Sequence, residues 1–257
     1  MHGWGIFKTK EQEQCDIHTL NELKKVITIS KTSEIKLRYL GLHGDNCSTI
    51  YNGISDEPRI NEVCGDLDLQ EIARLKNTGY FIAGVVGTID QRKNQMLVLR
   101  AIQSLPPKMK IKFFFVGEGE VSKLQSFSNN FHLSEKVRFV GYKKNARKFI
   151  DLFDLLICSS RSEGGPPIAL MEAFALKTIV LVSNTPEHME AIIENNTGFS
   201  FEDDNHADLK NKIVKIYGKT DLNYYKRNAY EFFKENFLFE KTFKSYKNQY
   251  NKLISIK

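Results

Sequence analysis

The sequence predicts an α/β protein whose core is a doubly wound parallel sheet, and two observations carry this prediction. From about residue 79 onward, short apolar runs alternate with longer segments of helical periodicity. The segments between successive apolar runs are long enough for right-handed crossovers, which place helices on both faces of a parallel sheet. A chain of 257 residues with 41% hydrophobic content also has the material for a substantial core.

The expected strands are short runs rich in Phe, Val, Ile and Leu, separated from the helical segments by turn residues. They span residues 81–86, 111–116, 137–140, 155–158 and 178–182. The expected helices lie between them and span residues 94–105, 120–131, 145–153 and 167–176. This strict alternation predicts a Rossmann-like domain, in which ligands bind at the carboxyl ends of the strands.

A shorter α/β fragment precedes this domain. Residues 25–30 and 48–51 are predicted strands, and residues 31–40 are a predicted helix between them. Two strands are too few to close a second sheet, so these residues either pack onto the main domain or are the remnant of a larger one. We place the domains at residues 1–57, 58–235 and 236–257, the last being a terminal helix.

The composition excludes several classes of protein. Lys plus Arg exceed Asp plus Glu by six, 37 against 31, which suits a nucleotide phosphate or an anionic lipid surface, but no nucleic-acid-binding signature accompanies them. The four cysteines form no C-x-x-C pair and the histidines show no metal-ligand spacing, so no metal site is expected. No apolar stretch approaches the roughly 20 residues that span a bilayer. We expect a cytoplasmic protein, and peripheral contact with the inner face of the membrane is compatible with this.

Residues 159–173, SSRSEGGPPIALMEA, are the most informative stretch because they follow a predicted strand and open a predicted helix. The free N–H groups at a helix start carry roughly half a positive charge toward a ligand. Gly164 and Gly165 allow the backbone to approach that ligand closely. Glu163 lies in the loop, which favours a functional role. Glu172 lies in an apolar helix, where a buried salt bridge, a solvent-facing position and a hydrogen bond to ligand hydroxyls remain open.

These residues resemble the family 4 retaining glycosyltransferases, whose hallmark is a Ser-x-x-Glu-Gly turn followed by a second Glu. Further segments resemble family signatures in the family's order along most of the chain: residues 50–54, residues 86–89 with Lys93 and Asn94, residues 115–119 and residues 137–142. Members have the GT-B fold, in which two Rossmann-like domains hold the donor and the acceptor on either side of a cleft.

The resemblance implies transfer of a sugar from a nucleotide diphosphate sugar to a hydroxyl of a glycan or lipid-linked acceptor, with retention at the anomeric carbon. The pathway implied is the synthesis of bacterial-type surface glycan or lipopolysaccharide. The nucleotide sugar is a substrate, and neither a cofactor nor a metal is implied.

Site roles follow from the same resemblance. Lys93 would hold the donor diphosphate and stabilise its charge as the sugar leaves. Glu163 would hold the sugar with the backbone of Gly164 and Gly165, and Glu172 would bind the ribose hydroxyls. The other donor-side positions are Gly87, Thr88, Arg92, Gly117, Gly141, Tyr142, Pro166 and Ile168. Among these, Gly141 and Tyr142 would border the base, although Tyr142 could equally be a packing residue.

His2 is a third catalytic candidate beside Lys93 and Glu163. Family members place a catalytic histidine at the end of an N-terminal strand, often before small residues, and residues 2–5, HGWG, resemble that segment. A disordered terminal histidine is the alternative.

The sequence departs from the family pattern in three respects. Eight residues rather than seven separate Glu163 from Glu172, so the turn between them must bulge. Thr88 stands where the family usually has an arginine. The absence of that arginine weakens phosphate binding unless Arg92 or another cation substitutes. Most of the acceptor domain is absent, so apolar surface on residues 26–40 and on the terminal helix is expected to be exposed unless a second copy or another chain covers it.

Three functions therefore remain open. The first is the sugar transfer described above. The second is a truncated, catalytically weak or inactive protein that binds a nucleotide sugar. The third is a dinucleotide-binding oxidoreductase domain, which is disfavoured because residues 84–87, GVVG, lack the spacing of a G-x-G-x-x-G motif.

Overall fold

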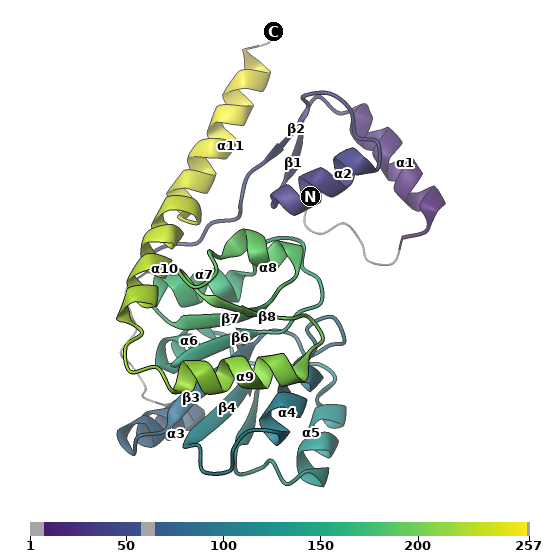
Figure 1. Ribbon diagram of the computed structural model, residues 1–257. Helices are drawn as coiled ribbons and strands as arrows, with labels where there is room; N and C mark the ends of the chain where they lie inside the picture. The colour runs from purple at the N-terminus through teal and green to yellow at the C-terminus, as the bar shows by residue number, and fades with distance from the viewer. Residues whose placement is uncertain (1–7, 58–64, 256–257) are drawn as a thin grey trace.

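The computed structural model describes residues 8–57 and 65–255. Its main part is a six-stranded parallel sheet in the order β5-β4-β3-β6-β7-β8 (Figure 1). The strands are β3 (Phe81–Val86), β4 (Ile111–Val116), β5 (Val137–Gly141), β6 (Leu155–Cys158), β7 (Ile179–Ser183) and β8 (Phe199–Phe201). This is the strand order of the Rossmann fold, in which the chain turns in opposite directions from the two central strands. The predicted doubly wound sheet is confirmed.

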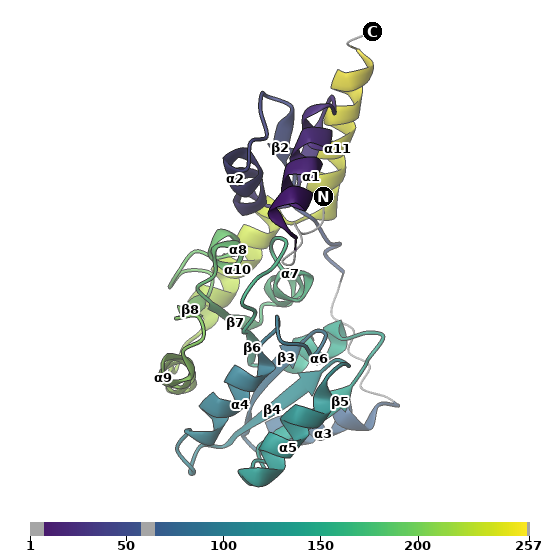
Figure 2. The ribbon, with the colours of Figure 1, turned by 90° about the vertical axis from the view of Figure 1, so that its right-hand side faces the viewer.

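Helices cover both faces of this sheet. They are α3 (Leu67–Asn77), α4 (Gln95–Gln103), α5 (Val121–Asn130), α6 (Arg147–Leu152), α7 (Ile168–Ala175), α8 (Pro186–Ala191), α9 (His206–Tyr217) and α10 (Asn223–Asn236). One buried cluster joins α4, α5 and α9 to one face, and a second joins α3, α6, α7 and α10 to the other. Figure 2 shows the sheet between these two layers.

The strands alternate between the two clusters, as the period of two requires. In β4, for example, Phe113 and Phe115 belong to one cluster and Phe114 to the other, and all three are buried. Burial on both faces explains why these strands are continuous apolar runs in the sequence.

The N-terminal segment forms a smaller unit of α1 (Lys10–Asn21), β1 (Val26–Thr28), α2 (Lys31–Tyr39) and β2 (Cys47–Thr49). The strands β1 and β2 pair in parallel as a separate two-stranded sheet. A small cluster around Val26 and Leu37 forms its core. The predicted strands and helix of this segment are confirmed, and α1 is an additional helix.

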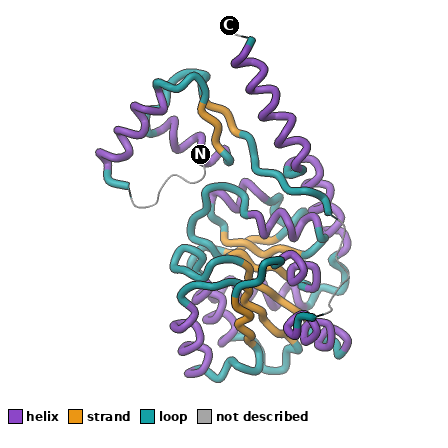
Figure 3. The backbone as a smooth tube through the Cα atoms, turned by 180° about the vertical axis from the view of Figure 1, so that it is seen from behind, coloured by secondary structure: helices purple, strands orange, loops and turns teal. Residues whose placement is uncertain are grey.

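Helix α11 (Phe239–Ile254) extends from the main part on the side where the N-terminal unit lies, as Figures 1 and 3 both show. The segment after β2 is tied to the start of this helix, because Ile54 N donates to Phe237 O at 2.9 Å and Phe239 N donates to Ile54 O at 3.0 Å. None of the α11 residues is buried, and Phe243 and Tyr250 are 60% and 63% exposed. The expected exposure of apolar residues on the terminal helix is therefore observed. For residues 26–40 the expectation is wrong in part, because Ile35 and Tyr39 are exposed but Val26, Ile29 and Leu37 are buried.

Several elements are absent from the sequence prediction. Helix α3 follows Asp66, whose carboxylate accepts from Asp68 N and Leu69 N, and α9 follows Asn205, which caps it in the same way. These N-cap residues are signals that the sequence does contain. Strand β8 has three residues, which is too short for a periodic pattern.

Candidate functional site

A cavity of about 770 Å³ lies at the carboxyl ends of β3 and β6, the two central strands from which the chain turns in opposite directions. In an open α/β sheet this is the position where ligands bind. The loop after β3, residues 87–95, forms one part of its wall, and the loop after β6 with the start of α7 forms another. Ile29, which directly follows β1 in the N-terminal unit, also lines the cavity.

The cavity brings together most of the residues predicted from the sequence. They are Gly87, Thr88, Arg92, Lys93, Glu163, Gly164, Gly165, Pro166, Ile168 and Glu172. The extra residue between Glu163 and Glu172 is absorbed in the loop, since α7 begins at Ile168 and both carboxylates still line the cavity.

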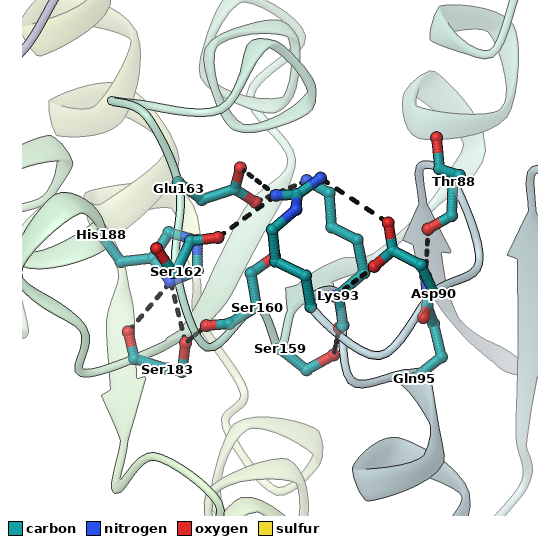
Figure 4. A network of polar contacts seen from close by, with 11 residues as sticks. Thr88, Asp90, Lys93, Gln95, Ser159, Ser160, Ser162, Glu163, Ser183 and His188 are labelled. Carbon is teal, nitrogen blue, oxygen red and sulfur yellow. Dashed lines mark hydrogen bonds and ion pairs between the residues drawn. The ribbon is translucent and has the colours of Figure 1, made fainter. Parts of the chain in front are cut away.

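Lys93 and Arg92 both bind the Glu163 carboxylate (Figure 4). Lys93 Nζ lies 2.5 Å from Glu163 Oε1, and Arg92 Nη1 lies 2.9 Å from Oε2. The same Arg92 nitrogen donates to Ser162 O at 3.2 Å. Arg92 Nη2 also lies 3.8 Å from Asp90 Oδ2, so the two cations face two carboxylates. An anionic ligand in the cavity would compete with these carboxylates for Arg92 and Lys93.

Hydrogen bonds within the loop after β3 and between the two loops hold this pair of cations. Lys93 N donates to Asp90 Oδ1 at 2.7 Å, and Ser159 Oγ donates to Lys93 O at 2.8 Å. Asn94 then adopts a left-handed conformation with φ 52° immediately before α4. An αL residue at a helix start is uncommon and costs conformational energy, which is typical of functional turns.

Glu163 remains ionised despite its environment. Burial raises the pKa of this carboxyl, but the charge and hydrogen bond of Lys93, a hydrogen bond from Ser160 and the charge of Arg92 together lower it below its usual value. A permanently charged Glu163 accepts hydrogen bonds and donates none.

Glu172 has a different environment. Its pKa is raised, chiefly by burial, with the charge of Arg147 opposing and that of Glu57 adding to the shift. Among the described residues, none donates a hydrogen bond to its carboxylate and none forms an ion pair with it within 4.0 Å. The buried salt bridge considered from the sequence is thus not found in this part of the chain, and the carboxylate faces the cavity.

Gly117, Gly141 and Tyr142 do not line the cavity. Gly117 N donates to Gly141 O at 2.9 Å, and a Cβ at Gly117 would lie 1.9 Å from Gly87 O. Gly117 therefore lets the loop after β4 pack against the loop after β3, which is a supporting role. Tyr142 is 65% exposed, so it is not a packing residue here. Contacts of Gly141 and Tyr142 with a base stay predictions.

His2 lies outside the described residues. Within residues 8–57 and 65–255, no group of three or more His, Cys, Asp or Glu side chains is arranged to hold a metal ion. Over the same residues, no helix combines the length and the apolar character needed to cross a membrane.

Several polar residues of the site are not predicted from the sequence. Gln95 is 2% exposed, lines the cavity and donates from Nε2 to Thr88 O at 2.8 Å. Ser159, Ser160 and Ser162 line the cavity beside Glu163. Their position directly after a buried strand was the available signal, because such residues fall at the ligand-binding edge of the sheet.

His188, on α8, is a further unpredicted residue; it is fully buried, and its ring contacts Ser183 (Figure 4). Ser183 Oγ donates to Ser160 O at 2.6 Å, so at His188 Nδ1, 2.9 Å away, it can only accept. This places the imidazole proton on Nδ1. Burial lowers the pKa of His188 to about 4, so the ring is neutral near pH 7.

The sequence of the main part matches a known family. The model of the glycosyl transferases group 1 family covers residues 68–232. The chain belongs to this family. The resemblance noted in the sequence is thereby confirmed, and it includes the loops that form the cavity.

Curated relatives of this chain bear the name glycosyltransferase. The uncharacterized glycosyltransferase MJ1069 of Methanocaldococcus jannaschii is 26% identical over 236 residues. The O-antigen biosynthesis glycosyltransferase WclY of Escherichia coli is 27% identical over 232 residues. Each alignment covers 90% of this chain but only 59% and 62% of the relatives, so the chain spans about three fifths of their length.

Solved structures share the fold. Anabaena Alr3699/HepE in complex with UDP superposes with a TM-score of 0.85 at 17% identity, covering 95% of this chain and 68% of that one. The same protein in complex with UDP-glucose gives a TM-score of 0.84. The fold is that of the GT-B glycosyltransferases over part of their length.

Proposed function

We propose that this group 1 glycosyltransferase transfers a sugar, of hexosyl type, from a nucleotide diphosphate sugar to a hydroxyl acceptor with retention at the anomeric carbon. The acceptor would be a glycan or a lipid-linked glycan in the synthesis of bacterial-type surface polysaccharide. The protein would work in the cytoplasm, with peripheral contact at the inner face of the membrane. The single observation that carries the proposal is the Arg92–Lys93–Glu163 cluster in a cavity at the switch point of the sheet.

The two cations support binding of a diphosphate. Arg92 and Lys93 occupy adjacent positions at the start of α4, where backbone N–H groups add partial positive charge. As the bond between the sugar C1 and the phosphate oxygen breaks, the diphosphate leaves with the electron pair. Preplaced positive charge lowers the free energy of that step. Arg92 would supply the guanidinium that Thr88 cannot.

The two carboxylates support recognition of hydroxyl groups. Charged Glu163 would accept hydrogen bonds from the donor sugar, next to the Gly164–Gly165 turn. Glu172 has no hydrogen-bonded partner among the described residues, so its oxygens would be available to the ribose hydroxyls. HepE, which shares the fold, has been solved with UDP and with UDP-glucose, and these are the natural first probes.

A binding protein without turnover is the second candidate, because a specific observation favours it. Of the described N-terminal residues, only Ile29 lines the cavity, and its side chain cannot move a proton or attack a sugar. If the binding protein is the correct candidate, a catalytic group would have to come from outside the described residues.

Calorimetric titration of the chain with UDP, UDP-glucose and other nucleoside diphosphates, run beside an assay for sugar transfer and donor hydrolysis, separates these candidates. Turnover supports the transferase, and tight binding without turnover supports the binding protein. If neither UDP, UDP-glucose nor any other nucleoside diphosphate binds at millimolar concentration, both proposals fail.

Glu172→Gln is the variant that tests the ribose contact. It should weaken nucleotide binding about tenfold, as expected for one hydrogen bond to a charged group, with little change in melting temperature. Glu135→Gln, an exposed carboxylate far from the cavity lining, is the matched control. A large fall in melting temperature with unchanged affinity would make Glu172 a structural residue.

A further inference from the structure

The start of α2 contacts the glycine turn of the candidate site. Ser33 Oγ donates to Gly164 O at 3.0 Å, and Ser30 Oγ lies 3.1 Å from the same oxygen and 2.8 Å from Ser33 Oγ. Each hydroxyl has one proton, so a relay from Ser30 to Ser33 to Gly164 satisfies all three oxygens. Residues about 130 positions apart in the sequence are thus joined at the cavity.

Glu190, on α8, holds the same end of α2. Its carboxylate accepts from Lys31 N at 2.5 Å, from Thr32 N at 3.0 Å and from Thr32 Oγ1 at 2.8 Å. Tyr51 OH, from the segment after β2, donates to it at 2.7 Å. One carboxylate therefore satisfies two free N–H groups of the helix start and complements the positive end of the helix dipole.

The turn itself is shaped for this contact. A Cβ at Gly165 would lie 2.9 Å from Ile29 O, so the close approach of the turn to the end of β1 depends on glycine. Gly165 is buried and lines the cavity, and no described residue accepts a hydrogen bond from its N–H. A buried donor without a partner is costly, and its place at the cavity wall makes a ligand its natural acceptor.

A hydrogen bond to one side of the Gly164–Gly165 peptide bond also orients its other side. In a trans peptide the C=O of Gly164 and the N–H of Gly165 point in opposite directions. When Ser33 holds Gly164 O against α2, Gly165 N–H must point away from α2. We propose that Ser33 and Glu190 are positioning residues that fix the Gly164–Gly165 turn, so that Gly165 N–H is preset to bind the sugar portion of the donor. This inference rests on the proposed function.

The double variant Ser30→Gly/Ser33→Ala tests the contact, because either hydroxyl alone could still donate to Gly164 O. Glycine is tolerated at an N-cap and alanine is the best helix former, so α2 should be disturbed little. In the protein without ligand, hydrogen exchange of the peptide spanning residues 162–166 should become about fivefold faster, the factor for one lost hydrogen bond. In calorimetry, affinity for UDP-glucose should fall by about the same factor, while affinity for UDP changes less than about twofold. A merely structural role would lower both affinities together.

Two further variants complete the test. Glu190→Gln keeps the size of the side chain but loses one accepting oxygen, so it should reproduce the pattern of the double variant. Ser126→Ala is the matched control, because Ser126 is an exposed helical serine outside the cavity lining. Its exchange and both affinities should equal those of the unaltered chain.

The outcomes separate this inference from the proposed function. If the unaltered chain binds neither UDP nor UDP-glucose, the proposed function fails, and the exchange of residues 162–166 then decides the positioning role by itself. Unchanged exchange in both the double variant Ser30→Gly/Ser33→Ala and Glu190→Gln overturns that role. So do equal losses of UDP and UDP-glucose affinity, when the unaltered chain binds both.

Discussion

The six-stranded sheet and the two-stranded sheet are both parallel, but they hold their parts of the cavity in different ways. The large sheet has a core on each face, and the loop after β3 packs directly against the loop after β4 through Gly117. The small sheet has one small core; Ile29 lines the cavity at a close approach to Gly165, and hydrogen bonds of Ser33 and Glu190 join the unit to the main part. One wall is therefore fixed by a large packed core, and the other by one close approach and a few polar contacts whose net energies are modest.

Replacement of Gly117 should have the largest effect on the free energy of unfolding, because it disrupts the close packing between the loops after β3 and β4. Its φ of +151° is unfavourable for other residues, and a Cβ would lie 1.9 Å from Gly87 O. Gly117→Ala should lower the free energy of unfolding by more than about 4 kcal/mol, as measured by urea denaturation. The matched control is Gly79→Ala, where φ is +79° but nothing lies within 4 Å of the added Cβ. This control should cost only about 1 kcal/mol, and equal losses would show that packing is not the cause.

Acidification should have the next largest effect on the free energy of unfolding, because His188 is fully buried in the main part of the molecule. Burial lowers its pKa to about 4 in the folded protein, against about 6.5 for an unfolded histidine. The unfolded chain therefore binds more protons between these values. The free energy of unfolding is therefore highest above pH 6.5. It decreases as the pH falls toward 4, by about 3 kcal/mol in all.

Unfolding of His188→Asn at a series of pH values checks this expectation. The variant should be less stable near neutrality, but its stability should depend less on pH between 6.5 and 4. His206→Asn, at an exposed position, should keep the pH dependence of the unaltered chain. The assignment to His188 is wrong if the two variants show the same dependence.

Hydrogen exchange should show the difference between the sheets directly. We expect amides of β1 and β2 to be at least about tenfold less protected than those of β3 and β4, because a small core opens at lower free energy. Strand β8 is the internal control, since it also has three residues and lies at a sheet edge but packs on the large core. Equally fast exchange in β8 would mean that strand length, rather than core size, sets the protection.

The same contrast explains how much the sequence could predict. The continuous apolar runs of the large sheet fix its strands, and the loops after β3 and β6 carry Lys93 and Glu163 to one cavity, as the strand order requires. The contacts of Ser33 with Gly164 and of Glu190 with α2 join residues more than 130 positions apart, and no local pattern encodes them. The burial of His188 likewise depends on tertiary packing. Roles for His2, Gly141 and Tyr142, and the domain boundaries at residues 57 and 235, stay predictions.

Replacement of Tyr142 should have the smallest effect on the free energy of unfolding and a measurable effect on the affinity for UDP and UDP-glucose. Its side chain is 65% exposed, so Tyr142→Ala should change the free energy of unfolding by less than about 0.5 kcal/mol. If its ring borders the base, affinity for UDP and for UDP-glucose should fall equally, by about fivefold, because both ligands carry the same base. Tyr142→Phe should keep the affinity, since the aromatic face is retained.

Tyr39→Ala, at a 90% exposed position on α2, is the control and should alter neither the free energy of unfolding nor the affinity. Full UDP affinity in Tyr142→Ala would remove Tyr142 from the site, and an equal loss in Tyr39→Ala would show a non-specific cause.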